Sequence, residues 1–177
     1  PEFDTVSAVP RTAGVRSVLV FFGGADAGNE AGKVLQALRR LPEPRPHVRV
    51  VLGAANPHLE ELQAAARGLA GVELIERTGR MAELMAEADL GLGTCGGAAW
   101  ERCVLGLPTL VVITADNQRD DARLLHQMGA VRNLGDASAV DAGIWADALA
   151  GMLRDPDGLA RMSLAAAAVM QGRAGAA

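Results

Sequence analysis

SVLVFFGGADAGN, residues 17–29, places a short apolar run directly before a glycine-rich turn. Residues 17–22 are rich in Val, Leu and Phe, and such a run bounded by Gly23 and Gly24 is typical of a buried strand. Apolar residues then recur at helical spacing, which predicts a helix over 29–40. A strand, a tight turn and a helix form the repeating unit of a parallel α/β sheet.

The same alternation repeats along the rest of the chain. Further strands are expected at 47–52, 72–75, 89–92, 109–113 and 130–133, with helical stretches between them. This pattern predicts an α/β fold, a doubly wound, Rossmann-like, six-stranded parallel sheet covered on both faces. In such sheets ligands bind beyond the carboxyl ends of the strands, so we expect the site in the loops that follow strands.

Capping residues predict where two of the helices begin. Asn56 followed by Pro57 indicates an N-cap and a first helical residue, with Gly71 as the stop. Ser138 with Asp141 predicts a capping box in front of a later helix.

The beginning of the chain differs from the rest. Residues 1–16 are polar, are interrupted by Pro10 and Gly14, and lack periodicity, so we expect a linker there and one domain over 17–177. A chain of 177 residues that starts at Pro1 rather than Met is typical of a fragment.

Composition excludes several classes of protein. A net charge of −4 and an aromatic content of 3% argue against nucleic-acid binding. No apolar run reaches the roughly 18 residues of a membrane span. Cys95 and Cys103 indicate reduced thiols and a cytoplasmic protein. No His/Cys spacing indicates a metal site, so neither a metal nor a cofactor is expected.

Two glycine-rich stretches are candidates for a phosphate site. Gly23, Gly24 and Ala25 follow the first strand, and the next helix would offer free N–H groups to an anion; the alternative is a plain tight turn. The fourth strand is expected to end in residues 91–97 (GLGTCGG), a glycine-rich stretch that leads into a helix. They contain G-x-G-x-x-G, with Asp116 twenty residues after Gly96, which leaves a dinucleotide-binding module open.

Thr94, Gly96, Gly97 and Ala98 would present backbone or hydroxyl donors to a phosphate at a helix N-terminus. Cys95 has no local base and is interpreted as a small loop residue.

Polar residues beside these loops have two interpretations each. Glu101 is either a solvated first-turn acid or an acceptor for ribose hydroxyls. Asn117 and Gln118, after the fifth strand, either cap a helix or face the cleft. His47, His58 and His126 do not follow strands, so no general base is expected from them.

Several of these segments resemble a known family. FGGAD at 22–26, MAELM at 81–85 and GAAWERCVLGLP at 97–108 are similar to the C-terminal domain of GT-B glycosyltransferases of the MurG type. The run through ADNQ at 115–118 is closer to the UDP-2,4-diacetamido-2,4,6-trideoxy-β-L-altropyranose hydrolases of pseudaminic acid biosynthesis and the related spore coat polysaccharide proteins. Pro1-Glu2-Phe3 resembles that family's junction between N-terminal and C-terminal domains.

The resemblance implies the C-terminal half of a GT-B fold that binds UDP or a UDP-sugar. The diphosphate would lie at Gly23, Gly24 and the helix near Gly97, and Glu101 would bind the ribose. The resemblance also implies that uracil would lie near Arg77, Thr78 and Met81. Asn117 and Gln118 would face the substrate.

The family's catalytic His belongs to an N-terminal domain that this chain does not match. Three functions therefore stay open: half of a nucleotide-sugar hydrolase, half of a glycosyltransferase, or a non-catalytic dinucleotide-binding module.

Overall fold

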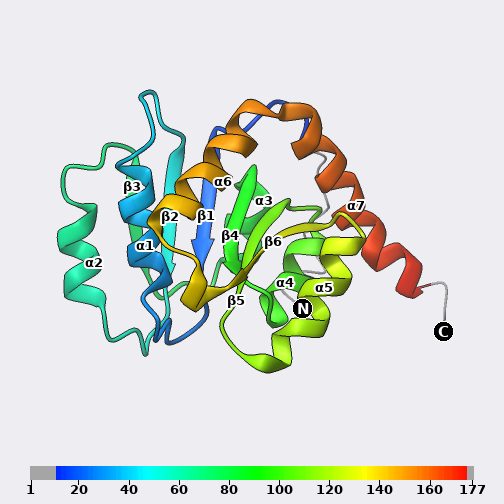
Figure 1. Ribbon diagram of the computed structural model, residues 1–177, viewed down its shortest axis with the longest axis horizontal. Helices are drawn as coiled ribbons and strands as arrows, with labels where there is room; N and C mark the ends of the chain where they lie inside the picture. The colour runs from blue at the N-terminus through cyan, green and yellow to red at the C-terminus, as the bar shows by residue number, and fades with distance from the viewer. Residues whose placement is uncertain (1–10, 175–177) are drawn as a thin grey trace.

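The computed structural model describes residues 11–174, which form one sheet with helices on both faces (Figure 1). The strands are β1 (Ser17–Phe21), β2 (His47–Leu52), β3 (Val72–Glu76), β4 (Leu90–Thr94), β5 (Thr109–Ile113) and β6 (Val131–Asp136). Their order is β3-β2-β1-β4-β5-β6, and all neighbours pair in parallel. The predicted doubly wound sheet is confirmed.

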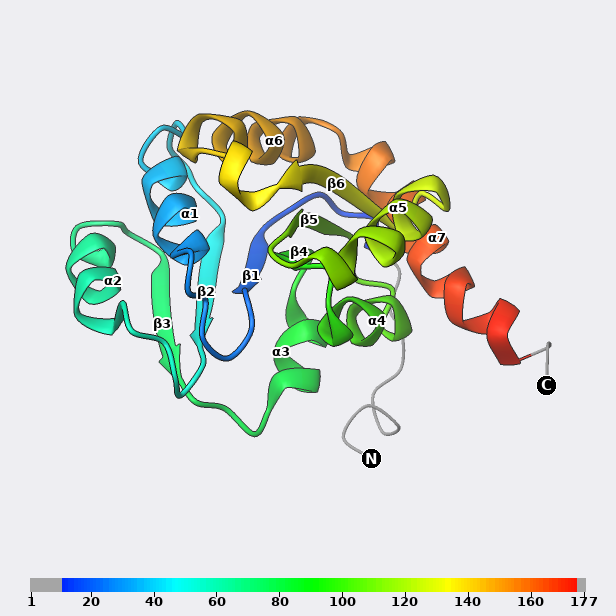
Figure 2. The same ribbon diagram turned by 60° about the horizontal axis from the view of Figure 1, so that its bottom comes forward.

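Seven α-helices are assigned in the described range: α1 (Glu30–Leu38), α2 (Leu59–Ala66), α3 (Met81–Glu87), α4 (Gly97–Val104), α5 (Arg119–Gln127), α6 (Ala142–Arg154) and α7 (Pro156–Ala174). Figure 2 shows α6 above the sheet and α3 below it. The carboxyl ends of the strands lie along the lower edge of the view in Figure 1, which Figure 2 turns toward the reader.

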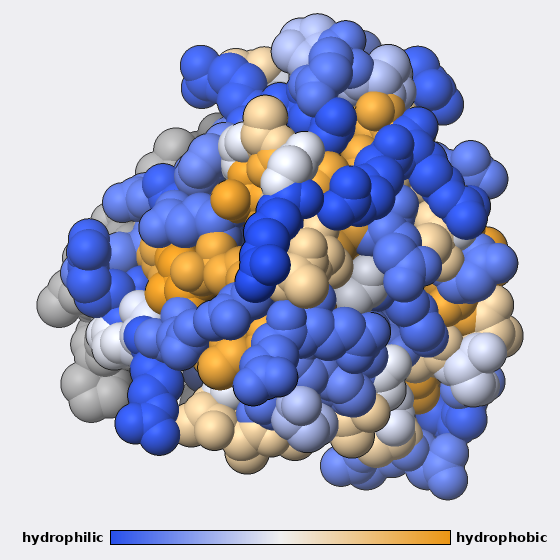
Figure 3. Space-filling model, turned by 90° about the vertical axis from the view of Figure 1, so that its left-hand side faces the viewer, coloured by the Kyte–Doolittle hydropathy of each residue, from blue (hydrophilic) through white to orange (hydrophobic). Residues whose placement is uncertain are grey.

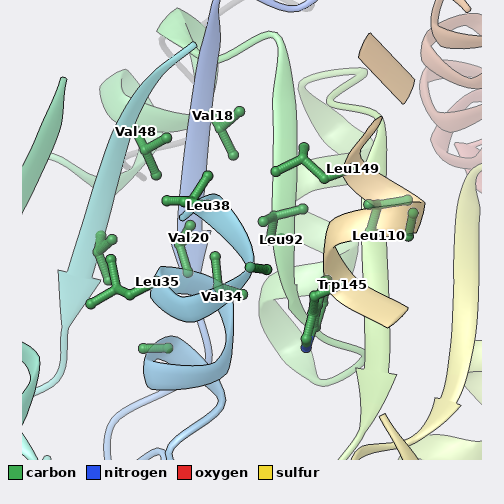
Figure 4. Packing of buried hydrophobic residues seen from close by; sticks show 14 of the residues in the cluster. Val18, Val20, Val34, Leu35, Leu38, Val48, Leu92, Leu110, Trp145 and Leu149 are labelled. Atoms are coloured by element: carbon green, nitrogen blue, oxygen red, sulfur yellow. The ribbon is translucent and has the colours of Figure 1, made fainter. Parts of the chain in front are cut away.

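Strand residues alternate between two cores. Val18 and Val20 of β1 belong to the cluster that also contains Leu38 of α1 and Trp145 of α6 (Figure 4). Leu19 instead packs on the opposite face, in a cluster with side chains of α3 and of the α4–β5 connection. This period of two, with both faces buried, explains the nearly continuous apolar strands of the sequence.

A third cluster lies beneath α5 and α7. It includes Val111 and Ile113 of β5 and Leu125 of α5. At the opposite edge, β3 exposes Glu73 and Glu76, and the surface around α2 and β3 is mostly hydrophilic with small hydrophobic areas (Figure 3). Charged side chains on an edge strand discourage pairing with other strands.

Helix boundaries depart from the sequence prediction in two places. Asn56 does not cap α2; its side chain accepts from the His58 amide 2.8 Å away and forms a turn, and α2 ends at Ala66 rather than near Gly71. Asp141 alone caps α6, accepting from two backbone amides, while Ser138 lies in the short 3-10 turn η3 (Ala137–Ala139). The predicted capping box is wrong, because Ser138 belongs to this 3-10 turn and the N-cap of α6 is Asp141.

Of the segment 1–16, which is expected to be a linker, only residues 11–16 belong to the described residues. Arg11 is only 5% exposed. Its guanidinium donates to the carbonyl oxygens of Met85, Ala88 and Leu105, near the C-terminal ends of α3 and α4. Helix C-termini leave carbonyls without donors, and an arginine supplies several at once. Arg11 therefore packs against the ends of α3 and α4.

Within residues 11–174, no helix is both long and apolar enough to cross a membrane. Nor do these residues gather three or more His, Cys, Asp or Glu side chains in a way that would suit a metal ion.

Candidate functional site

The strand order reverses between β1 and β4. The two strands are neighbours, with Phe21 paired to Gly93, yet the chain leaves β1 toward β2 and leaves β4 toward β5. Loops that diverge in this way leave a crevice at the carboxyl ends of the strands, where ligands of doubly wound sheets bind. The two glycine-rich stretches singled out in the sequence flank this point.

The loop after β1 presents its backbone to the crevice. Gly23 has a φ of +90°, and a Cβ atom on Gly23 or Gly24 would meet nothing within 4 Å, so both glycines are open on that side. Gly24 and Ala25 are exposed. The Gly24 carbonyl accepts from the Ala55 amide at 3.3 Å, and a Cβ on Gly53 would lie 2.2 Å from that oxygen, so the β1 and β2 loops are packed backbone to backbone.

The expectation that α1 offers free amides to an anion is wrong. The buried Asp26 carboxylate accepts from the Glu30 and Ala31 amides at 2.8 and 3.0 Å, and Asn29 accepts from the Gly32 amide at 3.1 Å. A side-chain anion thus already occupies this helix N-terminus. Burial raises the pKa of Asp26, while the two amide hydrogen bonds act in the opposite direction.

The N-terminus of α4, by contrast, is open. No side chain caps it at Gly96, and within residues 11–174 the amides of Gly97 and Ala98 have no acceptor. Gly97 is exposed and Ala98 is half-buried. Unpaired amides and the positive end of the helix dipole make this terminus suitable for an anion.

The fourth strand ends within residues 91–97 as predicted, because β4 ends at Thr94. Gly91 and Gly93 lie inside β4, and only Gly96 and Gly97 follow the strand. A Cβ on Gly93 would lie 2.5 Å from the Phe21 carbonyl and 2.7 Å from Nη1 of Arg102. Glycine is required there by close packing, so the literal G-x-G-x-x-G does not form a dinucleotide-binding turn.

Thr94 and Gln118 lie beside the α4 N-terminus. Thr94 is 8% exposed, and its Oγ1 and the Gln118 Nε2 are each 3.9 Å from where a Cβ on Gly96 would be. The Gln118 side chain is held by the Thr114 amide and hydroxyl at 3.1 Å each. Residues from the β4 and β5 loops therefore meet at one place.

Asn117 lies in the 3-10 turn η2 (Asp116–Gln118) and is exposed. Neither Asp116 nor Asn117 caps α5, whose N-cap position is Gln118 without a side-chain hydrogen bond, so the capping interpretation of this stretch is wrong. Glu101, one turn into α4, is half-buried, and its carboxylate makes no hydrogen bond or ion pair with the described residues.

A hollow of about 260 Å³ lies beyond β1 and β2, and it is lined by Phe21, Leu52, Gly53, Arg77, Thr78 and Met81 among others. Arg77 has a φ of +55°, and its amide donates to the Leu52 carbonyl at 3.3 Å. Met81 and Ala98 pack against the same apolar cluster. The structure therefore brings residues 77–81 close to the start of α4.

The histidine prediction needs one correction. His58 lies in the loop after β2, not inside α2, and its Nε2 is 3.3 Å from the Ala27 carbonyl. His126 contacts the Val131 carbonyl at the other edge of the sheet.

Sequence reasoning missed Arg102. This side chain is 2% exposed, lies over Gly91 and Gly93, and donates to the Thr94 carbonyl at 2.5 Å. Burial lowers its pKa to about 10, which leaves it protonated at neutral pH. A signal for a buried arginine was present in the sequence. Arg102 lies between the apolar helix positions Ala99 and Cys103, and the preceding strand carries the glycines Gly91 and Gly93.

The thiols next to Arg102 are protonated at neutral pH. Cys95 and Cys103 are free and buried, and burial raises the pKa of each to about 11. The interpretation of Cys95 as a small loop residue, rather than an activated thiol, agrees with this.

Residues 17–176 match the family described as Glycosyltransferase family 28 C-terminal domain. The chain belongs to this family. It is 31% identical over 121 residues to the spore coat polysaccharide biosynthesis protein SpsG of Bacillus subtilis, covering 68% of this chain and 36% of that protein.

A second relative, from Chromobacterium violaceum, is the UDP-N-acetylglucosamine–N-acetylmuramyl-(pentapeptide) pyrophosphoryl-undecaprenol N-acetylglucosamine transferase. It is 36% identical over 154 residues, covering 82% of this chain and 41% of the transferase. Among solved structures, MurG of Acinetobacter baumannii superposes with a TM-score of 0.72 at 18% identity, over 93% of this chain and 47% of that one. The family 28 chain thus spans less than half the length of these proteins, and it has the GT-B C-terminal fold.

Proposed function

We propose that this chain is the UDP-binding half of a nucleotide-sugar enzyme. The observation that carries the proposal is the uncapped N-terminus of α4, which follows β4, while the open Gly23-Gly24 backbone follows the neighbouring strand β1 at the point where the strand order reverses. Helix amides and a glycine turn on two sides of one crevice suit a diphosphate. The domain would comprise residues 17–177 and act in the cytoplasm.

The diphosphate would contact Gly23, Gly24, Ala25, Gly96, Gly97 and Ala98 through backbone amides, with the Thr94 hydroxyl beside them. Since Asp26 and Asn29 occupy the amides of α1, the β1 loop would contribute only its glycine turn. The larger share of phosphate binding would fall on α4.

The base and the ribose, which are bonded to each other, would lie together beside the first turn of α4. The hollow at Arg77, Thr78 and Met81 offers backbone groups and an apolar floor to a uracil ring. Glu101 would accept hydrogen bonds from the ribose hydroxyls. In support of this role, its carboxylate is half-buried and without a protein partner in the described range.

For the reaction, we propose hydrolysis of a UDP-sugar that releases UDP and a free diacetamido-trideoxy sugar for surface polysaccharide synthesis. Asn117 would orient the substrate, because it is exposed at the carboxyl end of β5 beside Gln118. The general base would come from an N-terminal domain. Similarity to a spore coat polysaccharide protein favours this reading.

A glycosyltransferase half is the second candidate. It is favoured by the relative named as an N-acetylglucosamine transferase, which matches over 82% of this chain. Both candidates use the same UDP site. A dinucleotide-binding module is disfavoured, because Gly91 and Gly93 lie within β4 and cannot approach a pyrophosphate.

Titration of the chain with UDP and with NAD, followed by amide NMR shifts, tests the binding site. We expect UDP to shift Gly23, Gly97 and Glu101; shifts with NAD but not UDP would overturn the proposal. For the reaction, the full-length protein is incubated with UDP-sugar and no acceptor. Release of free sugar with UDP supports the hydrolase, and release only when an acceptor is added supports the transferase.

A further inference from the structure

Arg102 carries a buried positive charge without an ion pair in the described range, and Glu101, the preceding residue, is the carboxylate whose charge favours it. The side chain is 2% exposed, and no carboxylate forms an ion pair with it among residues 11–174. Its Nε atom is buried without a hydrogen-bond partner in this range. The neighbouring Cys95 and Cys103 are neutral thiols at physiological pH. Buried charges are normally paired, and Arg102 has neither an ion pair nor a hydrogen bond at Nε in this range, which leaves room for an anionic partner.

The position of this charge points to α4's N-terminus. A helical side chain leans toward the N-terminus of its own helix. Accordingly, the Arg102 guanidinium reaches back past Gly93 and donates to the Thr94 carbonyl, two residues before Gly96. It therefore lies beneath the turn that leads into the free amides of Gly97 and Ala98. The guanidinium and the helix dipole place positive charge at the same point.

The other loop of the crevice has the opposite charge. Asp26 and Glu30 are both buried at the N-terminus of α1, with Lys33 paired to Glu30 at 2.7 Å. An anion in the crevice would therefore be attracted toward α4 and away from α1. Arg102 is the buried cation on the α4 side, and it gives the two loops opposite charges.

We propose that Arg102 is the buried counter-charge for the diphosphate of the bound nucleotide, acting from beneath the Thr94–Gly96 turn without touching the ligand's base or ribose. This inference rests on the proposed UDP site and adds to it the group that selects for phosphate charge. Two chemical consequences follow. The contribution of Arg102 to ligand affinity should increase with the negative charge of the ligand. The affinity for uridine, which is uncharged, should not depend on Arg102.

The test measures Kd for uridine, UMP and UDP in the 177-residue chain and in Arg102→Met, which keeps the stem that fills the space over Gly91 and Gly93. We expect the preference for UDP over uridine to fall by about tenfold or more, with UMP intermediate, because a unit charge interacts strongly across a partly buried site. Uridine affinity should be unchanged. A role in general packing alone would weaken all three ligands equally, and loss of the hydrogen bond to Thr94 is separated from loss of charge by the comparison with Arg102→Lys.

Two further variants serve as controls. Arg102→Lys retains the charge and should retain most of the UDP preference. Arg11→Met removes another buried arginine, at the far ends of α3 and α4, and should lower stability without changing the ratio. If Arg102→Met does not fold, Arg102→Gln, compared with Arg102→Lys, measures the same difference in charge.

The outcomes separate the two proposals. If the unaltered chain binds UDP no better than uridine, the proposed phosphate site is wrong and the counter-charge with it. If the chain prefers UDP and the neutral Arg102 variants keep that preference, only the counter-charge is wrong. Loss of preference in Arg102→Lys as strongly as in the neutral variants would likewise overturn it, since charge would not be the cause.

Discussion

The guanidinium of Arg102 donates to the carbonyl oxygen of Thr94 over 2.5 Å, and so ties the middle of α4 to the last residue of β4. This bond crosses the turn at Cys95 and Gly96, which carries no side-chain cap. The turn is thus held from beneath rather than from its open side, and the amides of Gly97 and Ala98 remain available to a ligand.

Replacing Glu101 tests the ribose assignment. Because the carboxylate has no protein partner in the described chain, Glu101→Ala should leave stability nearly unchanged while weakening UDP binding by about 1–3 kcal/mol, the cost of unpaired hydroxyls. Isothermal titration calorimetry measures the change. Glu83→Ala, on the exposed side of α3, is the control, and equal UDP affinity in both variants would remove Glu101 from the site.

Gly93→Ala tests the close packing of β4 beneath α4. The new Cβ would lie 2.5 Å from the Phe21 carbonyl and 2.7 Å from Arg102 Nη1, so strand and helix must separate. We expect a loss of about 1–3 kcal/mol in the free energy of unfolding, as for other overpacked cores. Urea denaturation measures it. Gly79→Ala meets nothing within 4 Å and should be close to neutral.

Because the two thiols are buried, we expect the free energy of unfolding to fall at alkaline pH. In the folded chain Cys95 and Cys103 have a pKa of about 11, against an ordinary value of 9.0. Because the folded pKa is the higher one, their contribution is complete below about pH 9 and is lost as pH rises toward 11. Urea denaturation between pH 8 and 11 should show this decline. It should be shallower in the Cys95→Ala/Cys103→Ala double variant; identical slopes would show that the thiols ionise freely when folded.

Asp141 and Ser138 distinguish the two capping interpretations of α6. Asp141 accepts from the Gly143 and Ile144 amides at 2.8 and 3.0 Å, and these bonds lower the pKa of its carboxyl group. Asp141→Ala should therefore lower the thermal midpoint, and Ser138→Ala should not. Differential scanning calorimetry compares them. A larger effect from Ser138 would restore the capping box.

Local sequence patterns were enough to predict where the strands lie, because both faces of the sheet are buried. Residues 109–113 were predicted to the residue, and 17–22 to within one residue at the end. Helix ends were less predictable. Asn56 and Ser138 have the right chemistry for caps, but an Asx turn in one case and a 3-10 turn in the other satisfied the same amides differently.

The sequence predicted which loops carry the candidate site, but not how the residues of these loops are oriented. Gly23 and Gly24 follow β1, and Gly96 and Gly97 follow β4, whereas the glycines at 91 and 93 lie inside β4. Sequence spacing cannot distinguish a glycine that approaches a ligand from one that makes room for a buried arginine. That distinction depends on which strand face points toward α4.

The apolar run and glycine turn over 17–29 determined by themselves a strand, a tight turn and a helix, and their repetition determined the parallel sheet, because periodicity and burial act locally. Tertiary structure alone decided which helix N-terminus is free. The Asp26 carboxylate accepts from the amides of Glu30 and Ala31 at the start of α1. Within residues 11–174, no side chain caps the start of α4. Tertiary structure also placed Arg102 under this N-terminus, since only the pairing of β1 with β4 brings Phe21, Gly93 and Thr94 around one guanidinium.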